Sequence, residues 1–126
     1  MPKEREGPII ANQPIIYAIS DSIGETSESV VRATTSQFVQ EKFDIIRVPY
    51  VNSIEQIDKI VQEAKESNAV ICYTIVSPEI RAEVARKTQE LNVTAVDILG
   101  PVLTAIEKTS GLTPKNQPGL IQCLGS

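Results

Sequence analysis

The 126-residue chain contains no histidine and only two cysteines, Cys72 and Cys123. Without histidine, a Ser-His-Asp or Cys-His nucleophile system and the usual zinc sites are excluded. The cysteines form no C-x-x-C pair, and Cys72 lies in an apolar segment, where a thiol usually behaves as a small hydrophobe. We therefore expect no metal site, and any catalysis would depend on carboxylates, lysine, arginine or backbone dipoles.

Long hydrophobic runs are also missing. No apolar segment approaches the roughly 20 residues that span a membrane, and the first seven residues lack the apolar part of a signal peptide. The net charge of −4 argues against nucleic acid or an anionic membrane as the main partner. We therefore expect a cytoplasmic protein with no nucleic-acid and no membrane partner.

What the chain does contain is an alternation of apolar runs and helical patterns over residues 15–110. The runs predict strands at residues 15–19, 43–48, 69–76 and 93–99, with the second at a sheet edge and the third at the centre. A helical pattern follows each run, and the helices are expected to begin near residues 23, 54, 78 and 100. The fold class is α/β: a three-layer, Rossmann-like or flavodoxin-like open parallel sheet of four strands in the order 2-1-3-4, with helices on both faces.

Two terminal segments lie outside this alternation. Residues 1–14 combine mixed charge with proline and glycine and predict a flexible tail, although Ile9 and Ile10 could pair with a sheet edge. Residues 111–126 contain Pro114, Pro118 and Gly119 without any period and predict a linker toward a further domain. The domain itself is therefore expected at residues 15–110.

The segment Ser-Asp-Ser-Ile-Gly-Glu-Thr at residues 20–26 joins the first strand to the first helix. Ser22 and Glu25 have the spacing of a capping box, which would start the helix at about Ile23. The free N–H groups and the positive dipole end would then face the space above the strand, and Gly24 would let a ligand approach the backbone. The segment indicates an anion site, or else Ser22 and Glu25 only cap the helix.

Ligands of open parallel sheets bind beyond the carboxyl ends of the strands, where the connection order reverses. Here that point lies between the first and third strands. Arg81 could bind phosphate or carboxylate there, or it could be a surface residue or a partner of Glu79 or Asp97, and Asp97 itself could cap the turn after it. Thr74 at the end of the third strand also faces this point. The candidate contacts to an anion or partner are Ser20, Asp21, Ser22, Gly24, Thr26, Ser77 and Arg81.

Nucleotide-binding fingerprints are absent from the sequence. No G-x-G-x-x-G follows the first strand, and no G-x-x-x-x-G-K-[ST] occurs anywhere. Dinucleotide binding and P-loop chemistry within these residues are therefore disfavoured, and we assign no catalytic residue.

Four ordered motifs nevertheless resemble one family: residues 16–28 with Ser-Gln-Phe at 36–38, residues 73–81, residues 96–101, and Pro-Gly-Leu-Ile at 118–121. They are similar to the N-terminal half of the bacterial and plant pyruvate, phosphate dikinase regulatory proteins, which are bifunctional kinase-pyrophosphorylases. The version Ser-Asp-Ser-Ile-Gly-Glu-Thr resembles the dikinase-directed branch, whereas the branch directed at phosphoenolpyruvate synthase has Ser-Asp-Gly-Thr-Ala. The chain departs from the family after Ile121, where Gln-Cys-Leu-Gly-Ser replaces the usual His-Gln-Leu-Asp.

The resemblance implies an enzyme that phosphorylates a threonine of the dikinase with ADP and removes the phosphate with inorganic phosphate, releasing pyrophosphate. In that family a P-loop of a second, C-terminal domain holds these substrates, so neither ADP nor phosphate is expected on this chain, which would be inactive alone. This chain would then recognise the dikinase or complete the site together with the second domain. A structural or dimerisation module forming a homodimer, and a stand-alone domain that binds small anions, are the alternatives.

Overall fold

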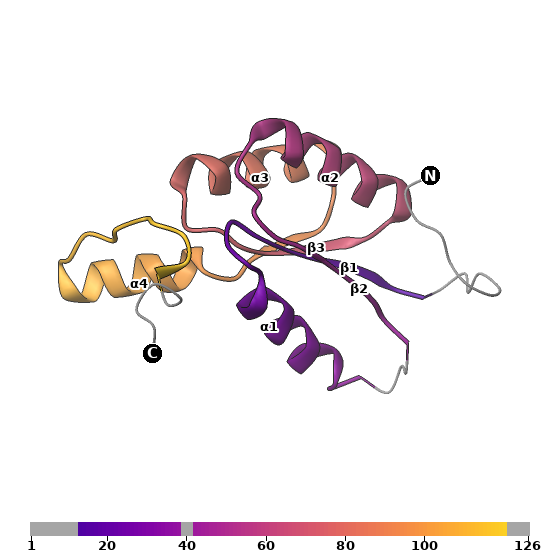
Figure 1. The fold of residues 1–126 in the computed structure, drawn as a ribbon, viewed down its shortest axis with the longest axis horizontal. Coiled ribbons are helices and arrows are strands. Elements are labelled where there is room, and N and C mark those ends of the chain that lie inside the picture. Colours follow the sequence, from indigo (N-terminus) through magenta and orange to yellow (C-terminus); the bar gives the residue numbers. More distant parts are fainter. Residues whose placement is uncertain (1–12, 39–41, 121–126) are drawn as a thin grey trace.

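The computed structural model describes residues 13–38 and 42–120. Most of the predicted tail, including Ile9 and Ile10, and the end of the chain with Cys123 lie outside this part. Strands and helices alternate through it, with short connections (Figure 1). The elements are β1 (Ile15–Ser20), α1 (Glu25–Thr35), β2 (Asp44–Val48), α2 (Ile54–Ser67), β3 (Val70–Thr74), α3 (Pro78–Leu91), β4 (Ala95–Asp97) and α4 (Gly100–Ser110).

The four strands form one parallel sheet in the order β2-β1-β3-β4, which confirms the predicted topology. The edge position of β2 and the inner position of β3 are confirmed as well. β1 and β3 are paired from Ile16 with Val70 to Ser20 with Thr74. Both strands therefore end at the same level, and the loops that follow them emerge next to each other.

The core lies between the sheet and the helices α2 and α3, which pack side by side on one face (Figure 1). Local sequence explains these two helices. Ser53 caps α2 in a capping box with Gln56, and Asn68 ends it in the left-handed conformation. Ser77 caps α3, Pro78 is its first residue, and Asn92 ends it in the left-handed conformation. The buried apolar side chains include Ile19, Ile57, Val61, Ile71, Ile75 and Val84.

Of the helices in the described part of the chain, only α1 lies on the opposite face of the sheet (Figure 1). Ser27 of α1 is fully buried and donates a hydrogen bond from its hydroxyl to the Cys72 carbonyl of β3 at 3.3 Å. Val96 of β4 is paired with Cys72, so both side chains lie on this face. Val96 is 48% exposed because no described helix covers the β4 side of the face.

The helix α4 does not pack on the sheet. It projects beyond the carboxyl ends of the strands, and the chain after it turns back along it (Figure 1). Two of its apolar side chains, Val102 and Ile106, are 54% and 58% exposed. In the turn between β4 and this helix, Asp97 Oδ1 accepts the N–H of Gly100 at 2.7 Å, and Gly100 is buried. The helices on both faces are therefore α1, α2 and α3.

Residues 111–117, in the segment predicted as a linker, form neither helix nor strand. Across residues 13–38 and 42–120, no helix is both long and apolar enough to cross a membrane.

Candidate functional site

The loop after β1 starts its helix later than the sequence predicts. The helix α1 begins at Glu25, and its N-cap is Gly24, with φ of +92° in the left-handed region and no side-chain cap. The predicted capping box is therefore wrong. Ser22 Oγ accepts the N–H of Ile23 at 2.6 Å instead. The left-handed turn at Gly24 moves the helix start by two residues, which places Glu25 in the first helical position, too early to answer a serine cap.

Arg47 of the edge strand holds this loop in place. Its Nε and Nη2 donate to the Ile23 carbonyl at 2.9 and 2.7 Å, and its Nη1 donates to Glu28 at 3.1 Å. A Cβ on Gly24 would lie 3.1 Å from Nε, so the glycine is needed for its backbone angle and for this close approach. A hydrogen bond from Arg32, together with the charges of Arg32 and Arg47, lowers the pKa of Glu28. Sequence reasoning missed Arg47.

Asp21 connects the loops after β1 and β3. Its Oδ2 accepts the N–H of Val76 at 3.0 Å and that of Ser77 at 3.2 Å. These are the backbone donors that a bound anion would use between the first and third strands. The carboxylate of Asp21 therefore occupies that position, and an external anion there would have to displace it.

Ser77 and Arg81 are both engaged with the protein itself. Ser77 Oγ accepts the N–H of Ile80 at the start of α3. Arg81 donates from Nη1 to the carbonyls of residues 75 and 76, at 3.3 and 3.4 Å, and its Nε lies 3.8 Å from Asp97 Oδ2. Arg81 thus links the end of β3 to the end of β4, and Asp97 is its partner, one of the alternatives that the sequence left open.

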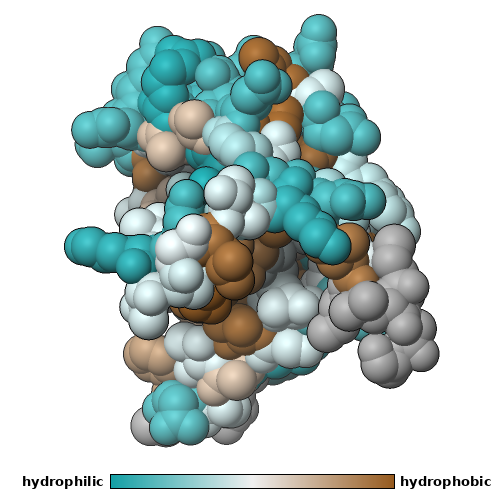
Figure 2. All heavy atoms as spheres, turned by 90° about the vertical axis from the view of Figure 1, so that its left-hand side faces the viewer, coloured by the Kyte–Doolittle hydropathy of each residue, from teal (hydrophilic) through white to brown (hydrophobic). Residues whose placement is uncertain are grey.

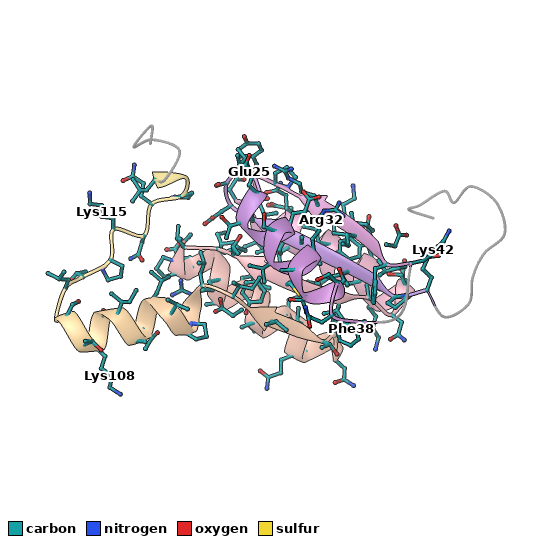
Figure 3. All side chains as sticks on the ribbon, turned by 90° about the horizontal axis from the view of Figure 1, so that it is seen from below. Glu25, Arg32, Phe38, Lys42, Lys108 and Lys115 are labelled. Carbon is teal, nitrogen blue, oxygen red and sulfur yellow. The ribbon has the colours of Figure 1, made fainter. Side chains whose placement is uncertain are left out.

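A cleft of about 550 Å³ opens between the first loop and α4. Figure 3 shows Glu25 at the start of α1 and Lys115 on the segment after α4, and both line the cleft. The predicted candidates that line it are Ser20, Asp21, Ser22, Gly24 and Thr26, and Thr74 lines it as well. Ser77 and Arg81 are not part of its lining, so the structure brings five candidates together and places two outside the cleft.

The second wall of the cleft is apolar and was not foreseen. It contains Leu99, Leu103 and Ile106 from α4 and the turn before it, and Leu112 from the segment predicted as a linker. Figure 2, which faces this end of the molecule, shows hydrophobic side chains exposed among polar ones. The spacing of Leu103 and Ile106 in the sequence indicates a helix, but it does not show which surface that helix borders.

The floor of the cleft is made of hydroxyls. Ser20 and Thr74 are neighbours across the β1–β3 pair, and each is only 4% exposed. Tyr17 of β1 bonds to Glu63 of α2, so the alternation of side chains along the strand places Ser20 on the other face, beneath α1. Among the residues that the structure describes, no group of three or more His, Cys, Asp or Glu side chains could hold a metal ion.

Comparison with known proteins decides the family, because residues 16–126 match the kinase/pyrophosphorylase family. The chain belongs to this family. It is 41% identical to a pyruvate, phosphate dikinase regulatory protein of Carboxydothermus hydrogenoformans over 109 residues, which is 86% of this chain and 39% of that protein. It is 46% identical over 110 residues to a protein of the same name from Alkaliphilus oremlandii, covering 87% and 40%. It is 42% identical over 115 residues to a protein of the same name from Bacillus subtilis, which is 90% of this chain and 43% of that protein.

The family membership confirms the resemblance seen in the four sequence motifs. The chain spans about two fifths of the length of the curated relatives that it matches.

Proposed function

We propose that this chain is the N-terminal domain of a bifunctional serine/threonine kinase and phosphorylase that regulates pyruvate, phosphate dikinase in the cytoplasm. The kinase would transfer a phosphoryl group from ADP to a threonine hydroxyl of the dikinase, leaving AMP. The phosphorylase would transfer it from the phosphothreonine to inorganic phosphate, restoring the hydroxyl and releasing pyrophosphate. The match to the kinase/pyrophosphorylase family and the names of the relatives support this proposal.

Within that activity, we propose that this chain recognises the protein substrate and is inactive by itself. Phosphoryl transfer needs cations or backbone amides arranged around several phosphate oxygens, usually with a P-loop lysine. The cleft lining contains one cation, Lys115, together with the acidic residues Asp21, Glu25 and Glu107. ADP and inorganic phosphate would therefore be held mainly by a part of the enzyme that this sequence does not contain.

The observation that carries this role is the composition of the cleft. A hydroxyl floor next to an apolar wall suits a polypeptide segment, whose backbone and side chains offer both kinds of contact. A compact anion would use only the floor.

Binding and activity can be tested separately on the 126-residue chain. We expect no threonine phosphorylation when it is incubated with ADP and the dikinase. We expect calorimetry to detect binding of the dikinase, weakened about tenfold or more by Ile106→Asp in the cleft wall. The matched control is Val102→Asp, because Val102 is similarly exposed on the same helix and does not line the cleft.

Two results would contradict the proposal. Phosphorylation of the dikinase by the chain alone would show that catalysis resides here. If both variants lose binding equally, or if neither variant changes the affinity, the cleft does not recognise the dikinase.

A homodimer is a second candidate role, favoured by the open half of the α1 face. Val96 is 48% exposed there, whereas parallel sheets are normally covered on both faces. A second copy of the chain related by a two-fold axis could place the same apolar surface against this one. Sedimentation should then show a dimer that Val96→Glu dissociates and Val102→Glu does not, and a monomer at all concentrations would contradict it.

A further inference from the structure

We propose that the start of α1 and the hydroxyls beneath it form an oxyanion subsite for one phosphate group. The helix α1 has 11 residues, and no side chain caps its N-terminus. Its first bond of the α-helical pattern runs from the N–H of Glu28 to the Gly24 carbonyl at 3.1 Å. The N–H groups of residues 25–27 thus precede the helical ladder, and Gly24, Glu25 and Thr26 line the cleft. An anion at this end would be attracted by the N–H groups and the helix dipole.

Thr74 supplies a second and independent observation. Its side chain lines the cleft, yet the residue is only 4% exposed, and its hydroxyl makes no hydrogen bond to any residue that the structure describes. No polar side-chain atom in this part of the chain is fully enclosed without a partner, so the Thr74 hydroxyl opens into the cleft. A hydroxyl that has lost most of its water without gaining a protein partner gains free energy when a ligand supplies the missing bond.

The neighbours of Thr74 favour a ligand that accepts hydrogen bonds. Ser20 lies directly opposite on β1, and its Oγ already accepts the N–H of Ser22 at 3.0 Å, which leaves the hydroxyl proton to be donated. Both strand side chains lie on the α1 face. Asp21 does not compete for these donors through its Oδ2, because that atom is bound to the two N–H groups at the start of α3.

These donors suit an oxyanion with several acceptor oxygens, and we take it to be a phosphate group, whose source is either free inorganic phosphate or a phosphorylated side chain. We assign it to a phosphorylated hydroxyl side chain of a protein, and this assignment rests on the proposed function. The apolar wall with Leu103 and Ile106 borders the same cleft, so a polypeptide could place its phosphate on the floor and its flanking side chains on the wall. Free phosphate would leave that wall unused.

Amide chemical shifts of the ¹⁵N-labelled chain would test the subsite directly. Inorganic phosphate and a phosphothreonine peptide are titrated in parallel, with the unphosphorylated peptide as reference. We expect both phosphates to shift the amides of residues 25–27, with tighter binding of the phosphopeptide. Thr74→Val, which removes only the hydroxyl, should weaken both about tenfold, as expected for one hydrogen bond to a charged group.

Thr88→Val is the matched control, because Thr88 is also 4% exposed and its hydroxyl bonds only to carbonyls of its own helix, α3. The Thr88→Val variant should bind both phosphate ligands with the same affinity as the parent chain. Ser20→Ala provides a second test should Thr74→Val unfold, and it should weaken binding in the same direction.

Three results would overturn the subsite: no shift with either ligand at about 10 mM, shifts centred away from residues 25–27, or equal affinity in the parent, Thr74→Val and Ser20→Ala. Equal affinity for inorganic phosphate and phosphopeptide, with the hydroxyl dependence intact, would retain the subsite and overturn the assignment to a phosphorylated side chain. None of these readouts uses the dikinase or ADP. A failed dikinase assay with an intact subsite would therefore reject the proposed function alone.

Discussion

Removal of the Asp21 carboxylate should destabilise the carboxyl edge of the sheet. One oxygen of this side chain accepts two backbone N–H groups of the β3–α3 loop, at 3.0 and 3.2 Å. A hydrogen bond to a charged group contributes about 1.5–3 kcal/mol. Because both bonds border an open cleft, where water can replace the acceptor, we take about 1 kcal/mol for each and expect Asp21→Ala to lower the free energy of unfolding by about 2 kcal/mol.

Thermal unfolding followed by circular dichroism would measure this effect. For a domain of this size about 1 kcal/mol corresponds to about 4 °C, so Asp21→Ala should unfold about 8 °C below the parent chain. Asp21→Asn keeps a neutral oxygen acceptor, so its unfolding temperature should fall by about half as much.

Asp58→Asn is the control for removing a carboxylate as such. Its side chain is 50% exposed, and Oδ1 lies 3.6 Å from Lys87 Nζ. Exposed pairs of this kind contribute less than about 1 kcal/mol, so the shift should stay within a few degrees. If Asp21→Ala unfolds at the same temperature as Asp58→Asn, water replaces the carboxylate without cost and the reasoning about the two loops is refuted.

Three further predictions concern the loop, the arginine and the pH dependence. Gly24→Ala should cost about 1–2 kcal/mol in a denaturant titration, since alanine is strained at φ of +92° and its Cβ would press on Arg47; an unchanged midpoint would contradict this. Arg81→Ala should cost about 1 kcal/mol through its lost bonds to Asp97 and two carbonyls but leave phosphate affinity unchanged, and a loss of affinity would return Arg81 to the anion site. Burial and the charge of Glu63 raise the pKa of Tyr17 above 10.0. The neutral Tyr17 side chain therefore makes its full contribution to the free energy of unfolding at pH values below the pKa of about 10 that it has in the unfolded chain. This contribution is lost as the pH rises through the pKa in the folded state. Tyr17→Phe should make the alkaline decline in stability shallower, and an identical decline would exclude the effect.

Local signals in the sequence predicted the elements that depend on neighbouring residues. The helix starts predicted near residues 54 and 78 are confirmed, and their cause is local: Ser53 and Ser77 cap α2 and α3 through bonds to backbone groups three residues away. The strand order followed from the alternation and from the apolar character of each run.

The features that were missed depend on residues far apart in the chain. The start of α1 is set by Gly24 together with Arg47, which belongs to another strand. The position of α4 is likewise decided by packing in space, because nothing in the period of Leu103 and Ile106 distinguishes a helix packed on a sheet from one that lines a cleft.

By itself, the sequence determined the α/β class and the family, and it indicated the hydroxyl-rich loop as the place to look for a site. These properties depend on periodicity, capping and short motifs, which are local. Only the tertiary structure decided which side chains face one another: Asp21 fills the position between β1 and β3, Arg81 pairs with Asp97, and Thr74 opens beneath α1. The reason is physical, because hydrogen bonding and burial depend on distances in space that the spacing of residues along the chain does not contain.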